Sequence, residues 1–229
     1  MAEPEEKNNL ANLAYVALKR DITEGAFQPG DKLLMSGLKE RYDIGAGPMR
    51  EALSRLVSER LVTAISQRGF RVAPMSIDEL KDIYFARAQL EAMITELAVQ
   101  RGGDEWEAGV IATAHTLSRV KEVQNTDEML GIWDNRHKAF HYAIASGCGS
   151  AKLMELRETM LDQAERYRQL WLREMVFSGE ALKSKQEEHR ELIDVLMSGD
   201  AQAARQLMFE HMMNPIPIIV RILESRGLA

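Results

Sequence analysis

The chain has almost no cysteine and no long hydrophobic run, and each absence excludes a class of protein. Cys148 is the one cysteine among 229 residues, so no internal disulfide can form, and we expect a semi-buried thiol in the reducing cytoplasm. The apolar stretch IPIIV, residues 216–220, is far too short to span a bilayer. The opening residues MAEPEEKNNL are acidic and polar, unlike a secretory signal. We therefore expect no membrane association and a flexible tail over residues 1–9.

Charge is distributed unevenly along the chain. The net charge of −6 argues mildly against a nucleic-acid partner if the chain is taken as one block. Residues 10–74, however, carry ten Lys and Arg against seven Asp and Glu, a net +3, whereas residues 75–229 carry a net −7. An acidic protein can therefore contain a locally basic face.

The first part of the chain reads as a winged helix-turn-helix. Helical segments are expected at residues 10–25, 35–42 and 48–59, followed by the β-rich runs LVTAIS and FRVAP, which QRG joins. Three helices and a small hairpin make this arrangement, and the composition changes at RVAPMSIDEL, residues 71–80. We therefore place one domain at residues 10–74.

The sequence pattern after residue 75 predicts a series of long helices. The expected segments are residues 77–101, 104–123, 126–146, 150–174, 180–198 and 200–213. Residues of the kind that begin and end helices mark their limits: Ser76, Asp104, Thr126, Ser150 and Asp200 as N-caps, and Gly102, Gly147 and Gly199 at the ends. Pro215 and Pro217 should break or kink the last helix. The fold is expected to be mainly α, with an antiparallel helical bundle over residues 75–229.

Several separate motifs in residues 29–72 resemble the DNA-binding domain of the GntR family of bacterial transcription regulators. They are QPGDKL, PMREAL, ERLV and RGF with a valine two residues on. The resemblance implies a DNA-binding protein, and its candidate contact residues are Ser36, Gly47, Arg50, Arg68 and Gly69. Where the family commonly has hydroxyl and basic side chains, this chain has Gly45, Ala46 and Gly47, which leaves the operator bases undetermined.

The residues themselves support a reading helix. A turn containing Gly45 and Gly47 would lead into a helix that opens at Pro48, where a missing N–H costs nothing. Arg50, near the helix start, could reach guanine O6 and N7, although alone it would read as a surface ion pair. Arg55 is rotated away, towards DNA backbone or solvent, and Arg68 with Gly69 forms the wing tip beside the minor groove.

Four of the five histidines are spaced so that they could meet. His137 and His141, in HKAFH, are separated by one helical turn and share a face. His189 and His211 lie about 15 and 18 Å from the turn at residues 198–200, so an antiparallel hairpin would bring them level. A packed or solvated pair remains the alternative for HKAFH, and His115 is expected to be an ordinary packed or solvated residue.

A second resemblance covers most of the remaining chain. FHYAIASGCGSAKL (140–153), EEHRELIDVLMSGDAQAARQLMFEHM (187–212) and the R..LE at Arg87–Glu91 resemble the FCD effector-binding domain of the FadR subfamily of GntR regulators. CGS and ERYRQL are similar, more weakly, to the carbon-starvation-induced regulators of that subfamily. The resemblance implies a divalent metal held by one Asp and three His, with a small carboxylate effector beside it.

This chain departs from that ligand set. His141, His189 and His211 match the three family histidines, while His137 stands where the family usually has the aspartate. Four neutral imidazoles would favour zinc or nickel and leave the metal's full charge to attract an anion. Asp134, one turn before His137, is expected to orient a histidine or, less favoured, to replace one as ligand.

The sequence thus predicts a homodimeric repressor that binds a palindromic operator in double-stranded DNA and is controlled by a small carboxylate, first of all a short dicarboxylate. Arg87 and Arg168 are the candidate effector contacts, with structural ion pairs as the alternative. A metal-dependent hydrolase is a second class, although HKAFH lacks the glutamate of HExxH and no placed general base is evident. A regulator that senses the metal itself, or whose helical part only dimerises, is the third.

Overall fold

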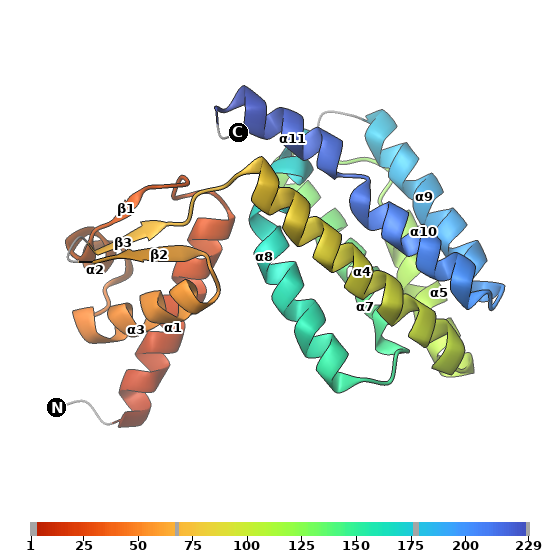
Figure 1. Cartoon of the computed structure of the whole chain (residues 1–229), viewed down its shortest axis with the longest axis horizontal. Coiled ribbons are helices and arrows are strands. Elements are labelled where there is room, and N and C mark those ends of the chain that lie inside the picture. The colour runs from red at the N-terminus through yellow and green to blue at the C-terminus, as the bar shows by residue number, and fades with distance from the viewer. Residues whose placement is uncertain (1–3, 67–68, 176–178, 228–229) are drawn as a thin grey trace. The chain divides into compact units, whose positions relative to one another are not determined.

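The structure, a computed structural model, describes residues 4–66, 69–175 and 179–227. The chain divides into two compact units, residues 1–76 and 77–229. Each unit has its own hydrophobic core, and they are described separately (Figure 1).

The first unit has three helices and a small sheet, as the sequence predicts. They are α1 (Pro4–Thr23), α2 (Met35–Tyr42) and α3 (Ala46–Ser58), with β1 (Lys32–Leu33), β2 (Val62–Ile65) and β3 (Gly69–Val72). The strands are antiparallel in the order β1-β3-β2, so β3 lies in the centre of the sheet. Strand β1, which the sequence analysis did not foresee, consists of two residues, too few to show an alternating pattern.

Two helix starts differ from expectation. Helix α1 begins at Pro4, so residues 4–9, expected as a tail, are helical. Helix α3 begins at Ala46 rather than Pro48, because proline is tolerated anywhere in a first turn. Gly47 therefore lies inside the helix, and the left-handed residue of the turn is Asp43 (φ 51°) rather than a glycine.

An ion-pair cluster ties α1 to α2 over a core in which Leu18, Met49, Leu53 and Leu56 are fully buried. Asp21 of α1 accepts hydrogen bonds from Arg41 Nη2 at 2.6 Å and from the Tyr42 hydroxyl at 2.8 Å. These side chains thus link α1 to α2.

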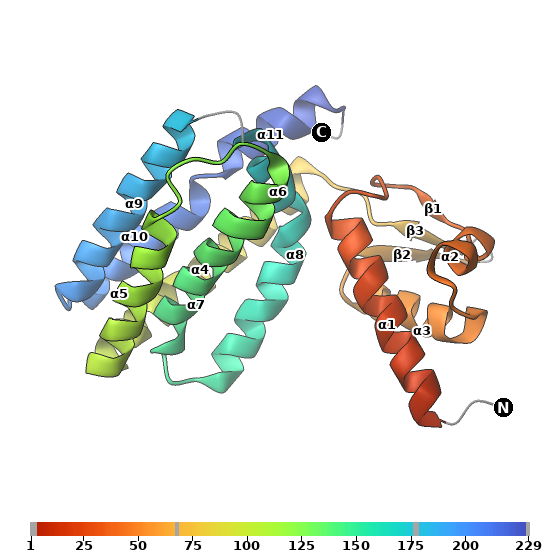
Figure 2. The same cartoon turned by 180° about the vertical axis from the view of Figure 1, so that it is seen from behind.

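The second unit is an all-helical bundle. It contains α4 (Ile77–Arg101), α5 (Asp104–Ser118), α6 (Thr126–Glu128), the π-helical turn η1 (Met129–Trp133), α7 (Asp134–Ser146), α8 (Ala151–Met175), α9 (Gly179–Met197), α10 (Ala201–Met213) and α11 (Ile216–Ser225). Helix α4 packs against α10, α8, α7 and α11 (Figure 1), and α5 packs against α7 and α9 on the other side of the bundle (Figure 2). In the described part of the chain no helix is both long enough and apolar enough to cross a membrane.

Helix limits in this unit follow the predicted capping with exceptions. Ser150 and Asp200 accept hydrogen bonds from the backbone N–H three residues on, at 3.3 and 3.0 Å. The cap residues before α5 and α6 are Gly103 and Asn125, not Asp104 and Thr126. Helix α5 stops at Ser118, five residues early, and α11 forms beyond the break at Pro215.

Two of the predicted helix-end glycines have a packing role. A Cβ on Gly102 would lie 2.2 Å from Trp106 Cε3, and one on Gly147 would lie 2.6 Å from Trp106 Nε1. The indole nitrogen also donates to the backbone oxygens of Ala143 and Ile144, at 3.1 and 3.0 Å. Trp106 therefore fixes the C-terminal half of α7, the helix that carries HKAFH.

Candidate functional site

The structure brings His137, His141, His189 and His211 together inside the helical bundle. Each offers one ring nitrogen, and these four nitrogens all lie within 4.8 Å of one another. His141 Nε2 is 3.1 Å from His137 Nε2 and 3.2 Å from His211 Nε2. The pairs come from α7 and from the α9–α10 hairpin, whose turn uses Gly199 at φ +75°. His115 lies outside the group, exposed on α5.

The ring spacing fits a metal ion. Metal–nitrogen bonds of about 2.0–2.1 Å put neighbouring ligand nitrogens about 2.9–3.4 Å apart, depending on the coordination geometry. Both closest distances, 3.1 and 3.2 Å, lie in that interval. His189 Nε2 and His141 Nδ1 are buried without a hydrogen-bond partner among the described residues. A buried ring nitrogen without a partner, as His189 Nε2 is, in a group of four close imidazoles suits a cation between the rings.

Burial keeps the four imidazoles neutral. It is the main cause that lowers the pKa of His137, His141 and His189 well below 6.5, and it lowers that of His211 as well. The neighbouring histidines and the cations Arg87 and Lys185 push in the same direction. Neutral imidazole is the form that ligates a metal, so the rings can bind one near neutral pH.

Aromatic side chains enclose the histidine cluster. The Trp133 ring stacks on His137 with centroids 4.6 Å apart and planes 19° apart, and Phe140 meets His141 and His189 edge-on. Trp133 is the last residue of the π-helical turn, where the sequence analysis expected continuous α-helix over residues 126–146. Such π-helical turns often occur at functional sites, and this one ends at the tryptophan that stacks on His137.

Glu188 and Lys185 belong to the site, although the sequence analysis did not name them. Glu188 Oε2 lies 3.0 Å from His211 Nδ1 and 2.5 Å from Lys185 Nζ. Burial alone would raise the pKa of Glu188, but hydrogen bonds from His211 and Lys185 lower it to about 2. A signal was present in the sequence, because Lys185 precedes His189 by four residues and shares its helix face.

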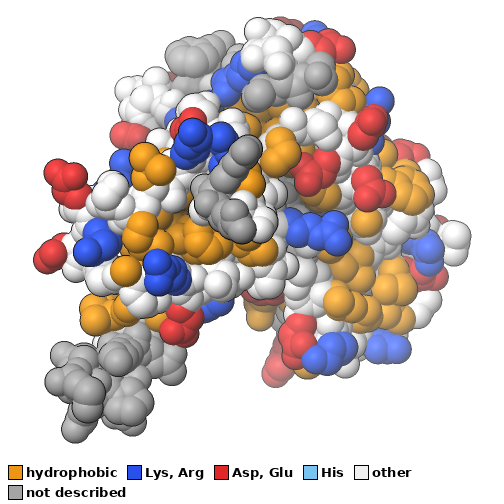
Figure 3. Space-filling view, turned by 60° about the vertical axis from the view of Figure 1, so that its left-hand side comes forward, with side chains coloured by type: hydrophobic (Ala, Val, Ile, Leu, Met, Phe, Trp, Pro, Cys, Tyr) orange, Lys and Arg blue, Asp and Glu red, His pale blue; other side chains and the backbone are white. Residues whose placement is uncertain are grey.

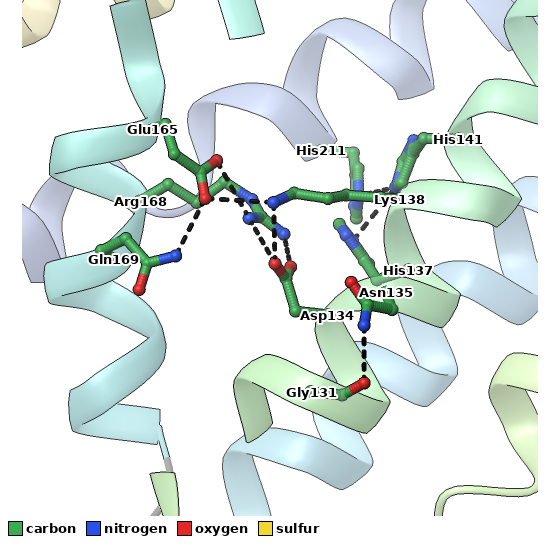
Figure 4. A network of polar contacts seen from close by, with 10 residues as sticks. All are labelled: Gly131, Asp134, Asn135, His137, Lys138, His141, Glu165, Arg168, Gln169 and His211. Atoms are coloured by element: carbon green, nitrogen blue, oxygen red, sulfur yellow. Dashed lines mark hydrogen bonds and ion pairs between the residues drawn. The ribbon is translucent and has the colours of Figure 1, made fainter. Parts of the chain in front are cut away.

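Asp134 is not placed as expected. Among the described residues it pairs with Arg168, from Nη1 to Oδ2 at 3.0 Å and from Nη2 to Oδ1, and with Lys138 Nζ at 3.0 Å, rather than with a histidine ring (Figure 4). Lys138 also reaches Glu165 at 3.0 Å. Asp134 and Arg168 are both buried. The prediction that Asp134 orients a histidine is therefore wrong, because a buried guanidinium one helix away is the stronger partner.

The ion pair with Asp134 also bears on the prediction that Arg168 contacts an effector. Burial and the nearby Arg87 lower the pKa of Arg168 to about 9, which leaves it charged at neutral pH. Its charge is already matched by Asp134, so an effector would have to share it.

Arg87 is the less engaged of the two candidate effector contacts. It is 6% exposed, and its Nε is 3.8 Å from Glu91 Oε1 with no hydrogen-bond partner among the described residues. Glu91 in turn accepts a 2.9 Å hydrogen bond from Arg157 Nε. Tyr84 is fully buried with an unpartnered hydroxyl, and burial raises its pKa to about 12. Arg87 and Tyr84 thus present unused donors on the buried face of α4.

The candidate DNA contacts lie on the surface of the first unit. Gly47 and Arg50 are exposed on α3 at a helical spacing of three, opposite the buried Met49 and Leu53. Ser36 is exposed in the first turn of α2, and Gly69 begins β3 at φ +85°, a conformation that favours glycine. Arg68 lies outside the described residues.

Arg55 is exposed to solvent, as expected for a residue rotated away from the reading face, and it also packs on α1. Its guanidinium carbon lies 3.7 Å from the centre of the Tyr15 ring, and Nη1 contacts Asn12 at 3.3 Å, both on α1. On the face of the molecule in Figure 3, lysine and arginine side chains are interspersed with hydrophobic and acidic ones rather than gathered in one basic patch.

Comparison with known proteins agrees with both sequence resemblances. Residues 10–72 match the family of bacterial regulatory proteins, gntR family, and residues 82–214 match the FCD domain. The HTH-type transcriptional repressor GlaR of Escherichia coli is 52% identical over 205 residues, 90% of this chain and 93% of the relative. The regulator BphR of Paraburkholderia xenovorans is 33% identical over 92% of this chain and 85% of its own length.

A solved structure shows the same fold. The structure of McbR/YncC of E. coli matches with a TM-score of 0.71 at 23% identity, over 96% of this chain and 99% of that one. The matched families and relatives are transcription regulators, so the hydrolase alternative is set aside. The chain belongs to the GntR family of bacterial transcription regulators and carries an FCD domain after its DNA-binding domain.

Proposed function

We propose that this regulator is a homodimeric repressor of the FadR subfamily whose DNA binding is controlled by a small carboxylate held beside a zinc or nickel ion. The observation that carries the proposal is the convergence of four buried, neutral imidazoles with an unpartnered arginine nitrogen nearby. Repression is suggested by the relative GlaR, a transcriptional repressor. FCD domains are often associated with a metal.

In this proposal His137, His141, His189 and His211 hold the metal. When bound, the metal supplies a positive centre to which a carboxylate can coordinate. Because all four ligands are neutral, no ligand reduces the charge of the ion, and an anionic effector is favoured. Arg87 would bind the effector's carboxylate through its guanidinium, and Tyr84 would donate its hydroxyl hydrogen.

Arg168 would be a secondary effector contact, in contrast to Arg87. Its pairing with Asp134 leaves less charge for an effector than Arg87 offers. A short dicarboxylate would use the metal for one carboxylate and Arg87, assisted by Arg168, for the other.

On the DNA side, Arg50 would read a base through the major groove, with Ser36 and Gly47 close to phosphate and Gly69 and Arg68 at the wing. Two copies of the chain would bind two half-sites of a palindromic operator, because a twofold dimer matches a palindrome. The support for this reading is the exposure of Arg50 and Gly47 on one face of α3.

Elemental analysis of protein purified without chelator or nickel resin tests the metal. We expect one zinc or nickel per chain in the wild type and no change in the control His115→Ala. His141→Ala should retain less metal, because losing one of four ligands should weaken binding by about 2.5–4 kcal/mol, one quarter of about 10–16 kcal/mol for a four-ligand site. Sub-stoichiometric metal that added zinc or nickel cannot restore would contradict the proposal.

Thermal shift with a panel of small carboxylates tests the effector. A ligand that binds only the folded state raises the melting temperature, and one at 100 times its Kd adds about 2.7 kcal/mol. His137→Asp should keep the metal but bind the same carboxylate more weakly, since the aspartate lowers the charge of the site. Arg87→Ala should also bind it more weakly. Operator binding by gel shift with and without the carboxylate then separates effector control from a regulator that senses the metal alone.

A further inference from the structure

Glu188 stands beside the histidine cluster without being one of its four members. It lies on α9 directly before His189, yet its carboxylate reaches across the hairpin to His211 on α10. Its side chain is 25% exposed, whereas that of His211 is 7% exposed. Glu188 thus lies at the edge of the cluster and contacts it through one ring.

The contact decides which nitrogen of His211 carries the hydrogen. An ionised carboxylate can only accept, so the 3.0 Å contact between Glu188 Oε2 and His211 Nδ1 requires the hydrogen on Nδ1. Nε2 is then left as a lone pair, and it faces His141 Nε2 at 3.2 Å, towards the centre of the cluster. The carboxylate therefore selects the tautomer whose free nitrogen points at the other three rings.

Glu188 is itself held in place. Lys185 Nζ, one turn earlier on α9, lies 2.5 Å from Oε2, and Asn214 Nδ2, just after α10, lies 3.3 Å from it. Lys185 is buried, with its ammonium 5.6 Å from the centre of the Trp171 ring. Three donors on one carboxylate oxygen fix its position, and the Lys185 charge offsets that of Glu188.

We propose that Glu188, which Lys185 holds in place, is a positioning residue that fixes His211 in the tautomer and orientation needed to bind the metal. The inference rests on the proposed metal site. The arrangement would also leave the charge of the metal ion available to an anion. The Glu188 carboxylate contacts the His211 ring instead of the ion, and Lys185 neutralises its charge. Such outer partners of metal-bound histidines typically contribute 10–100-fold to metal affinity.

The test is zinc affinity by competition with a chromophoric chelator on the full chain. We expect Glu188→Ala to bind zinc 10–100-fold more weakly, and Glu188→Gln, which keeps an oxygen acceptor, to recover most of that loss. Glu187→Gln is the matched control, since Glu187 is exposed one residue earlier. Unchanged affinity in Glu188→Ala while the wild type binds one zinc would overturn this inference alone. A wild type that binds neither zinc nor nickel would overturn the proposed metal site and this inference together.

Long-range proton–nitrogen NMR of the metal-free protein provides a second readout, which tests the wild type directly before any substitution at Glu188. The wild type should show His211 with its hydrogen on Nδ1, identified by the signal that disappears in His211→Ala. Glu188→Ala should show a mixture of tautomers. A wild-type ring with its hydrogen on Nε2 would overturn the proposal, as would equal losses of affinity in Glu188→Ala and Glu188→Gln.

Discussion

The two units of this regulator place their functional side chains in opposite ways. In the described part of residues 1–76, Asp21 is the one buried charged residue, and the candidate DNA contacts Ser36, Gly47 and Arg50 are exposed. In residues 77–229 the buried residues include the four clustered histidines and a set of charged side chains, among them Arg87, Glu91, Asp134, Arg157, Arg168 and Lys185.

The difference follows from the size of the partner. DNA is a large polyanion, and the protein side chains that contact it can remain exposed to solvent in the free protein. Their exposure costs the fold little free energy. A small ligand must be surrounded, and groups buried for that purpose cost free energy unless they are paired. Buried polar groups therefore indicate the function of the helical bundle. Exposed residues and the sequence motif indicate that of the winged helix.

The largest expected difference between the two units is in how acidification affects their stability. The histidines of the cluster have lowered pKa values when folded, so below pH 6.5 the unfolded chain binds more protons than the folded one. Their contribution to stability is present above pH 6.5 and is lost as the pH falls from there towards the folded pKa. Each histidine costs up to about 1.4 kcal/mol per pH unit. The first unit contains no histidine.

Hydrogen exchange of the full metal-free chain, followed by mass spectrometry at pH 7.5 and 5.5 with correction for the intrinsic rate, measures both units at once. We expect peptides from residues 77–229 to lose protection and those from residues 1–66 to keep it. Zinc should delay the loss to lower pH, because protons must displace the metal. Equal protection of the metal-free helical unit at both pH values would contradict the assignment of neutral buried rings.

The ion pair between Asp134 and Arg168 should matter more for stability than any pair on the first unit's surface. Both side chains are under 5% exposed, so Arg168→Ala leaves Asp134 buried with only Lys138, and we expect a loss of about 3–5 kcal/mol in the free energy of unfolding. Asp134→Ala with Arg168→Ala should cost less than the sum of the single changes. Additive losses in urea unfolding would show that the two side chains do not interact.

Arg50 and Arg55 test whether exposure on α3 marks the reading face. Arg50→Ala should weaken operator binding by about 1–3 kcal/mol and relax preference at one base position. Arg55→Ala is the comparison, because Arg55 packs on Tyr15; we expect it to lower stability slightly without changing base preference. A gel-shift titration in which Arg50→Ala binds as well as the wild type would remove Arg50 from base reading.

The wing should give the smallest effect. Arg68→Ala is expected to weaken binding to all DNA sequences alike and to reduce the slope of log K against log salt concentration by about 1, the change for one phosphate contact. Binding measured over a range of salt concentrations checks this, and a slope equal to that of the wild type would show that Arg68 does not contact the backbone.

Regular elements were predictable because their signals are local. Helix α4 at residues 77–101 and α2 at residues 35–42 have the predicted limits, since periodicity and flanking residues determine both. The π-helical turn at Met129–Trp133 was not predictable, because its residues also fit an α-helix and packing around Trp133 decides between them. On α4 Tyr84 and Arg87 are buried whereas Ile83 is half-buried and Ala86 is exposed, since the buried face of this helix borders the site.

In the candidate site, too, features with local sequence signals were predictable and contacts between helices were not. The meeting of four histidines follows from one helical turn and one hairpin register, both of which are countable in the sequence, and the structure places them so; their binding of a metal stays a prediction. Contacts between side chains of different helices were not countable. Asp134 was assigned to a histidine because they share a helix, but its partner Arg168 lies 34 residues away on α8.

The stacking of Trp133 on His137 also gives the protein an intrinsic fluorescent reporter. Trp133 and Trp171 lie with ring centres 6.2 Å apart beside the cluster, whereas Trp106, the remaining tryptophan, is held by α7 backbone oxygens. Any ion, proton or ligand that changes the electron density of the His137 ring changes the surroundings of an indole 4.6 Å away. If the proposed site binds a metal, tryptophan emission of the unlabelled protein is therefore expected to change on binding, and Trp133→Phe identifies the part of the signal that comes from this stack.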